Sequence, residues 1–205
     1  MTTIGIITPA IELMNTKHKK LSLFELGAKL SQDFCRNNNI PVPEYKIQSL
    51  DSTGLYLSQT RNRNAQILVN LDATANPVEN PGHMRWSHPA WKTDRTPFGV
   101  VLHETGHHLE LIMRQKGFWK AYDWTTISLR GKKVSGYEPN DSEAFAETMR
   151  LFIGNPDLLR LAIPNRYNYM CQVLKLQPIV SMDYKTAIGN SNYFPAAEMW
   201  VAKTK

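Results

Sequence analysis

Two histidines and a glutamate stand at a spacing that suits a metal-dependent hydrolase. His103 and His107 are four residues apart, with Glu104 beside the first, inside an apolar stretch that runs from 100 to 112. On a helix, side chains four residues apart project from one face, so both imidazoles can reach a single metal ion. Glu104 can then contact a water at the ion without being a ligand itself. The pattern predicts a zinc-dependent hydrolase.

A catalytic zinc site usually combines three protein ligands with one open position, so a third ligand must be found. His108 is rotated by about 100° from His107 on an α-helix and points elsewhere. The metzincin pattern asks for a glycine and then a histidine beyond His107, where this chain has Glu110 and Met113. Neither His108 nor a metzincin histidine therefore completes the site.

Glu143 is the best candidate for the third ligand. It precedes Glu147 by four residues, and carboxylates at this spacing on a helix repel each other unless a cation or a donor lies between them. Both are explained if Glu143 binds zinc while Glu147 accepts a hydrogen bond from the outer nitrogen of a zinc-binding histidine. The alternatives are a first-turn acid behind an Asn140 cap for Glu143, and a plain surface acid for Glu147.

The elements that would position these residues follow from hydrophobic periodicity and turn residues. A first helix is predicted over 23–37, and three short strands after it are expected to form a meander or a hairpin pair. The metal-binding helix begins at Thr96-Pro97 and ends at Gly117. The predicted strands are 45–50, 55–59 and 66–71, and the later helices are 118–130 (or an aromatic segment), 141–153, 157–163 and 166–176.

These elements predict an α+β fold. With 205 residues the chain can bury a real core, and we expect one domain over 1–205, with an N-terminal lobe over 1–96 and a helical lobe over 97–205. Residues 76–96 form a long connection rich in proline and tryptophan that we expect to flank the cleft. Its histidines, His83 and His88, are expected to be surface residues rather than ligands.

The net charge and the cysteine content limit which partners and which cellular compartment we expect. The net charge is +6 and the pI is near 9.3, but the basic residues are dispersed in small groups, which favours an ordinary solvated surface over a nucleic-acid-binding face. Cys35 and Cys171 are isolated, as is typical of free thiols in a reducing compartment. With neither an export signal nor an apolar run of membrane-spanning length, we expect a cytoplasmic protein without a membrane partner.

The two motif helices together resemble a known family. HExxH followed by a helix with Glu-x-x-x-Glu is the pattern of gluzincin zinc metallopeptidases, and residues 143–152 are similar to the matching helix of the anthrax lethal factor-like peptidases. The resemblance covers residues 97–153. It implies a zincin-like fold with a small antiparallel or mixed sheet above a helical lobe, Zn²⁺ as cofactor, and peptide-bond hydrolysis. That family also carries an oxyanion-stabilising tyrosine before this helix, and Tyr137 stands about one residue from the matching place.

The expected function is therefore that of a zinc endopeptidase acting on peptides or proteins. His103, His107 and Glu143 would hold the zinc, and Glu104 would act as general base and then general acid. Two alternatives stay open. A metal-dependent amidase or deformylase would share the zinc helix, although its third ligand is more often cysteine or histidine. A basic nucleic-acid-associated protein on a degenerate metalloprotease fold would need a concentrated cationic face, and it would have little need of Glu104.

Overall fold

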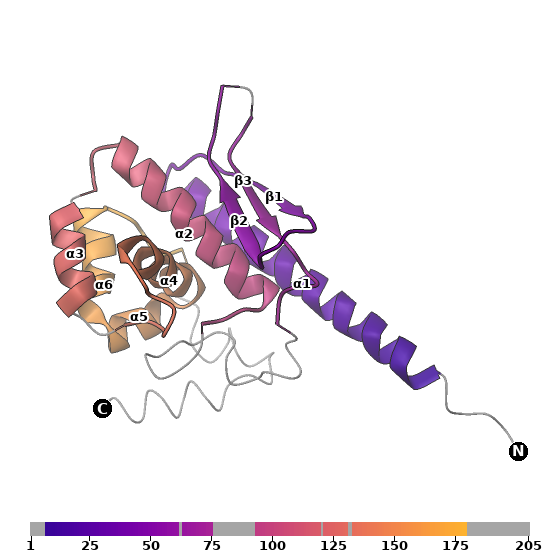
Figure 1. Ribbon diagram of the computed structural model, residues 1–205. Helices are drawn as coiled ribbons and strands as arrows, with labels where there is room; N and C mark the ends of the chain where they lie inside the picture. The colour runs from indigo at the N-terminus through magenta and orange to yellow at the C-terminus, as the bar shows by residue number, and fades with distance from the viewer. Residues whose placement is uncertain (1–6, 62, 76–92, 120, 131–132, 180–205) are drawn as a thin grey trace, which may run out of the picture.

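A long helix, a small sheet and a run of shorter helices follow one another in the computed structural model, which describes residues 7–61, 63–75, 93–119, 121–130 and 133–179 (Figure 1). The helices are α1 (Ile7–Asn37), α2 (Pro97–Gln115), α3 (Ala121–Arg130), α4 (Asp141–Gly154), α5 (Pro156–Ala162) and α6 (Pro164–Asn168), which continues into a π-helical turn, η2 (Tyr169–Val173). The strands are β1 (Glu44–Ile47), β2 (Gly54–Leu57) and β3 (Gln66–Val69). The fold is α+β with mostly helical content.

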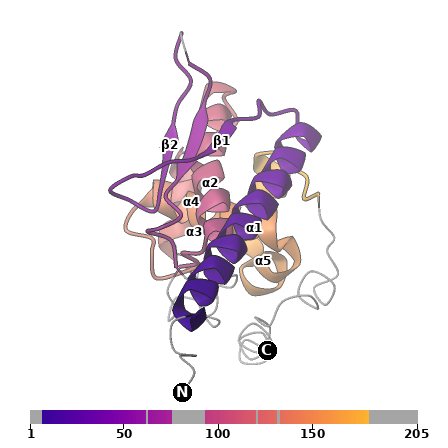
Figure 2. The ribbon, with the colours of Figure 1, turned by 90° about the vertical axis from the view of Figure 1, so that its right-hand side faces the viewer.

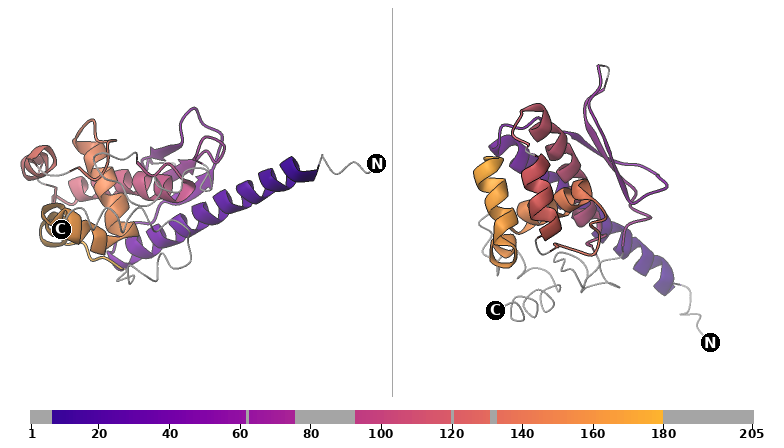
Figure 3. Two further views of the ribbon diagram at one scale, coloured as in Figure 1. Left: turned by 90° about the horizontal axis from the view of Figure 1, so that it is seen from below. Right: turned by 60° about the vertical axis from the view of Figure 1, so that its left-hand side comes forward.

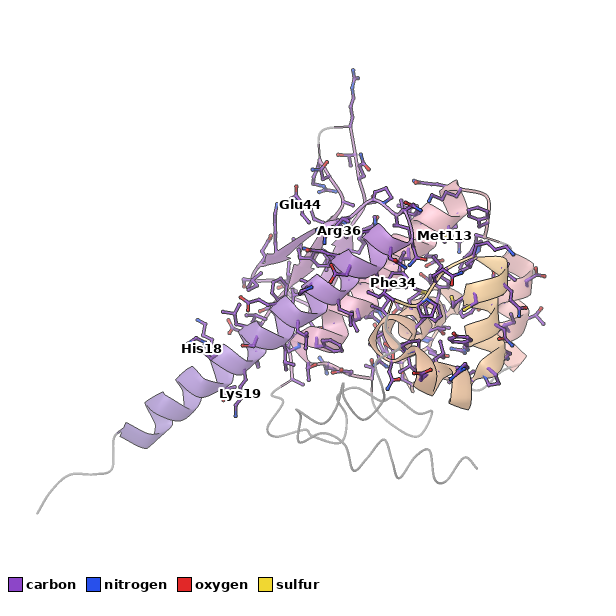
Figure 4. All side chains as sticks on the ribbon, turned by 180° about the vertical axis from the view of Figure 1, so that it is seen from behind. His18, Lys19, Phe34, Arg36, Glu44 and Met113 are labelled. Carbon is purple, nitrogen blue, oxygen red and sulfur yellow. The ribbon has the colours of Figure 1, made fainter. Side chains whose placement is uncertain are left out.

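The first helix is longer than the sequence predicted, because α1 begins at Ile7 rather than at residue 23. Its N-terminal half extends away from the other elements, while its C-terminal half lies along α2 (Figures 1 and 3). His18 and Lys19 lie on the extending half, and Phe34 lies where α1 meets the other helices (Figure 4). The sequence prediction relied on an apolar stripe, and such a stripe is present only where the helix packs against something.

The sheet is mixed, with the strand order β1-β3-β2. β2 pairs antiparallel with β3 as a hairpin, whereas β1 pairs parallel with the opposite edge of β3. The expected meander is therefore wrong for β1, which lies beside the third strand and not beside the second. The buried run Ile67-Leu68-Val69 gives the physical reason, because a strand buried on both faces suits the centre of a sheet.

α2 lies at the centre of the molecule. It packs against α1 and the sheet on one side and against α4 on another, and Figure 2 shows α1 crossing it diagonally. The predicted caps are present: Thr96 accepts a hydrogen bond from the Gly99 amide, and Pro97 occupies the first turn. Gly117, with φ at +72°, follows the helix in the left-handed conformation that glycine adopts most readily.

Two hydrophobic clusters hold α2 in place. The larger joins α1, α2 and α4 to the helices that follow, and it contains Phe34, Leu102, Leu109, Trp124, Phe145 and Phe152. The smaller lies under the sheet and contains Phe24, Ile67, Val69, Leu71, Val100 and Val101. Because α2 buries apolar side chains toward both clusters, its remaining face is left to carry the polar motif.

Two further expectations concern the cysteines and the membrane. Cys35 is buried and Cys171 is partly exposed, and both are free thiols, as expected. Within the described ranges, no helix combines the length and the apolar character needed to cross a membrane.

Candidate metal centre

Three side chains converge on one point between α2 and α4. His103 and His107 project from one face of α2, and Glu143 faces them from the first turn of α4. Glu143 Oε2 lies 3.0 Å from His103 Nε2 and 3.7 Å from His107 Nε2, and one ligand atom from each residue falls within 4.8 Å of the others. A zinc ion held tetrahedrally at about 2.1 Å from each ligand keeps the ligand atoms about 3.4 Å apart. The three residues fit a zinc ion.

The chemistry of Glu143 also calls for a cation. Its Oε2 atom is buried, and although His103 Nε2 lies 3.0 Å away, no group in the described ranges makes a well-aligned hydrogen bond to it. A buried carboxylate oxygen without a donor is costly, so such an atom is rare unless an ion satisfies it. The neighbouring rings of His103 and His107 hold the pKa of Glu143 at about 2, and the carboxylate is therefore ionised.

The raised pKa of His103 also shows that the surrounding carboxylates favour a positive charge at this point. Burial by itself would lower the pKa of this imidazole, but Glu143 and Glu147 outweigh burial and raise the pKa to about 9. In the absence of a metal ion, a proton thus supplies the positive charge that the carboxylates attract. A divalent cation would replace that proton and satisfy the same groups.

Glu147 lies on the far side of His103, in the contact that its spacing predicted. Its Oε1 atom is 2.8 Å from His103 Nδ1, and the residue is fully buried, so it is not a surface acid. Burial would raise the pKa of this carboxyl, but Arg150 and His103 bring the pKa well below its usual range. An ionised carboxylate can only accept, so His103 donates from Nδ1, and the neutral form of the ring has its Nε2 lone pair facing Glu143.

Two further residues hold Glu147, and the sequence analysis did not predict them. Arg150 donates to Oε2 of Glu147 at 2.9 Å and to Oε1 at 3.1 Å, and Thr93 donates to Oε1 at 2.9 Å. The signal for Arg150 was a lone cation among apolar residues of α4, which implies a buried partner. Thr93 gives no such signal, because it reaches α4 from the segment before α2.

Glu104 lines the same cleft without being part of the three-residue cluster. Burial raises the pKa of its carboxyl, the two histidines lower it, and the net shift is upward. Such a shift brings a carboxylate toward the pKa of an effective general base. The cleft is about 540 Å³ in volume, and its lining comes from β2, α2, and the chain that enters α4: Gly54, Leu55, Tyr56, His103, Glu104, His107, Glu110, Leu111, Arg114, Tyr137, Ser142 and Glu143.

A second hollow adjoins the candidate metal cluster. It is about 350 Å³ in volume, shares Gly54, His103, Glu104 and Tyr137 with the first and leads toward Ser52, Thr53 and Arg95. Glu104 therefore borders both hollows. An extended ligand lying in both hollows would pass Glu104.

Tyr137 lies at the rim, with its ring centroid 5.8 Å from that of His103 and about half of its surface exposed. Burial, then the negative charges of Glu143 and Glu104, raise the pKa of its phenol, so the hydroxyl keeps its proton at neutral pH. Glu138 fixes the preceding turn by accepting from the amides of Val134 and Ser135. The structure thus places the Tyr137 ring beside His103, at the rim of the cleft.

The other candidate histidines differ in their outcome. His108 is buried away from the cluster, where its Nε2 donates to the Pro41 carbonyl at 2.7 Å and its Nδ1 lies 3.1 Å from the Tyr56 hydroxyl, which donates to it. It links the chain before β1 to β2 and is not a ligand. His83 and His88 lie outside the described residues, as does most of the connection over 76–96.

Comparison with known proteins gives no match: no protein-family model, no curated protein and no solved structure matches this chain. The case for a function therefore comes from the two motif helices and from the geometry they produce.

Proposed function

We propose that this chain is a zinc-dependent peptidase of the gluzincin type, with a zincin-like arrangement of its helices and sheet. The observation that carries the proposal is the convergence of His103, His107 and Glu143 around a buried carboxylate oxygen that lacks a well-aligned donor, with Glu104 beside them. Zinc, when bound there, would polarise a carbonyl group and lower the pKa of a water molecule. These are the two requirements for hydrolysing an amide.

The chain's own residues then carry the proton and stabilise the charge. Glu104, whose pKa is raised, accepts a proton from the attacking water and returns it to the departing amine. Tyr137 keeps its phenolic proton and donates a hydrogen bond to the oxyanion that develops on the carbonyl oxygen. Glu147 holds the His103 ring in the tautomer that leaves its inner nitrogen free.

The form of the cleft favours a peptide or protein as substrate. β2 is an edge strand, paired with β3 on one side, and its residues Gly54, Leu55 and Tyr56 line the cleft. The Tyr56 amide already donates to Glu104, and the other outward-facing backbone groups of β2 can pair with an extended peptide, which gives affinity independent of side chains. A peptide paired in this way would lie across the cleft beside Glu104.

Metal analysis and one conservative variant test the proposal. The purified protein should hold about one zinc ion per chain, as a mononuclear site does. Glu104→Gln should keep the zinc and lose hydrolysis of an unbiased peptide library, because the amide cannot take the proton. Glu25→Gln, an exposed change of the same kind on α1, is the matched control and should keep both. Absence of zinc, or full hydrolysis by Glu104→Gln, would overturn the proposal.

A further inference from the structure

His107 is held through a chain of side chains, unlike His103, which contacts its carboxylate directly. The Ser142 hydroxyl lies 3.4 Å from His107 Nδ1 and 2.5 Å from Oε2 of Glu110. The other oxygen of Glu110 accepts two hydrogen bonds from Arg114, at 2.6 Å and 3.1 Å. The order of contact is therefore His107, Ser142, Glu110 and Arg114.

The direction of each hydrogen bond in this chain follows from the number of protons available. A serine hydroxyl has one hydrogen, and an ionised carboxylate can only accept, so the short contact shows that Ser142 donates to Glu110. The Ser142 oxygen then has only lone pairs to offer His107. The Nδ1 atom of His107 must accordingly carry the proton, and the Nε2 lone pair faces Glu143.

We propose that Glu110, acting through Ser142, is a positioning residue that sets the tautomer and the orientation of His107. The tautomer matters for activity only if the proposed function holds, because a metal can bind only the imidazole nitrogen that lacks a proton. Glu110 is buried on α2 one turn beyond His107, and Ser142 directly precedes Glu143 on α4. The chain of contacts thus ties one ligand on α2 to the segment of α4 that carries another.

The competing explanation is that these contacts are only structural. Glu110 and Arg114 would then form an ordinary pair one helical turn apart, and Ser142 would be a polar residue in the first turn of α4. That explanation leaves the tautomer of His107 free, and it predicts no change at His107 when Ser142 loses its hydroxyl.

Long-range proton–nitrogen NMR on the metal-free, full-length chain labelled at histidine separates the two explanations, because it shows which ring nitrogen carries the proton. Spectra would be recorded at mildly alkaline pH. We expect the Nδ1–H form of His107 in the wild type, loss of that preference in Ser142→Ala, and its retention in Ser142→Thr, which keeps the hydroxyl. Glu147→Gln is the matched control, since it acts on His103 and should leave the His107 signals in place.

Zinc affinity, measured by competition with a chromophoric chelator, gives a second readout. Loss of an outer partner of a metal ligand typically costs about 10- to 100-fold in affinity, and we expect the lower part of that range for Ser142→Ala and little change for Ser142→Thr. If His107 carries its proton on Nε2 in the wild type, or if Ser142→Ala leaves its tautomer unchanged, the inference is wrong even where zinc binds. If the tautomer responds as expected but the wild type binds no zinc, the positioning role of Glu110 and Ser142 stands and the proposed function fails.

Discussion

The two helices that carry the candidate ligands lie close together at Gly106, and enlarging this residue tests whether their spacing sets the site. A Cβ atom on Gly106 would lie 2.7 Å from Ala146 Cα and 3.0 Å from the Ala146 carbonyl oxygen. Carbon atoms in favourable contact are about 3.5–4.0 Å apart, so α2 and α4 would have to separate locally by about 1 Å. Both contacts are with backbone, and no side chain can rotate away to relieve them.

The expected effect of Gly106→Ala can be worked out from this geometry. Overpacking costs about 1–3 kcal/mol, and replacing glycine by alanine within a helix returns up to about 1 kcal/mol, so we expect a net loss of about 1–2 kcal/mol in the free energy of unfolding. Ala146 lies between Glu143 and Glu147, so the same displacement moves Glu143, the proposed third ligand, away from both histidines. Zinc sites tolerate deviations of about 0.2 Å, and we expect zinc affinity to fall at least about tenfold.

Gly154→Ala is the matched control, because it makes the same change on α4 against side chains that can move. Its Cβ atom would meet Leu102 Cδ1 at 3.0 Å and Phe98 Cε1 at 3.6 Å. We expect the free energy of unfolding, measured in urea, to stay within about 1 kcal/mol of the wild-type value, and zinc affinity to be unchanged. If Gly106→Ala binds zinc as tightly as Gly154→Ala, the close approach at Ala146 does not determine the metal geometry.

Three other changes test different parts of the structure. Gly54→Ala would place a Cβ atom 2.5 Å from Val100 Cγ1 and 2.8 Å from Glu104 Oε1 and displace the proposed general base, so hydrolysis should fall while the zinc content holds; unchanged hydrolysis would contradict the role proposed for Glu104. Arg166→Met leaves the buried Glu138 carboxylate without its cation and should cost about 3–5 kcal/mol in urea unfolding, whereas Arg160→Met, at an exposed pair, should cost less than about 1 kcal/mol. Burial raises the pKa of the Cys35 thiol to about 12, so iodoacetamide should modify Cys171 but not Cys35 until urea is added; mass spectrometry that finds Cys35 modified in the folded protein would refute its burial.

The helical part of the site could be predicted from the sequence because helical periodicity alone decides which side chains share a face. His103 and His107 needed no tertiary information, and neither did the caps at Thr96 and Asn140. For Glu143 the two sequence interpretations are compatible. Asn140 does accept from its amide as a helix cap, while the carboxylate of the same residue faces the histidines.

The remainder depends on contacts between residues far apart in the chain. The parallel pairing of β1 with β3 could not be read from three short strands whose turns allow more than one order. Ser142 reaches His107 across 35 positions, and Thr93 reaches Glu147 across 54. A hydrogen bond requires its two atoms within about 3.5 Å, and periodicity does not position different helices against each other that closely.

Charge balance gives an argument for a divalent ion that does not depend on the motif. Four carboxylates surround the two histidines, and two of them have their own guanidinium: Glu147 pairs with Arg150 and Glu110 with Arg114. Among the described residues no guanidinium pairs with Glu143 or Glu104, and their negative charge lies beside imidazoles whose outer nitrogens act as donors. Buried charge is stable only when it is compensated, so these carboxylates favour a cation at the point that Glu143 and the inner histidine nitrogens face. A zinc ion bound there would bring two positive charges, whereas a single proton on His103 brings one.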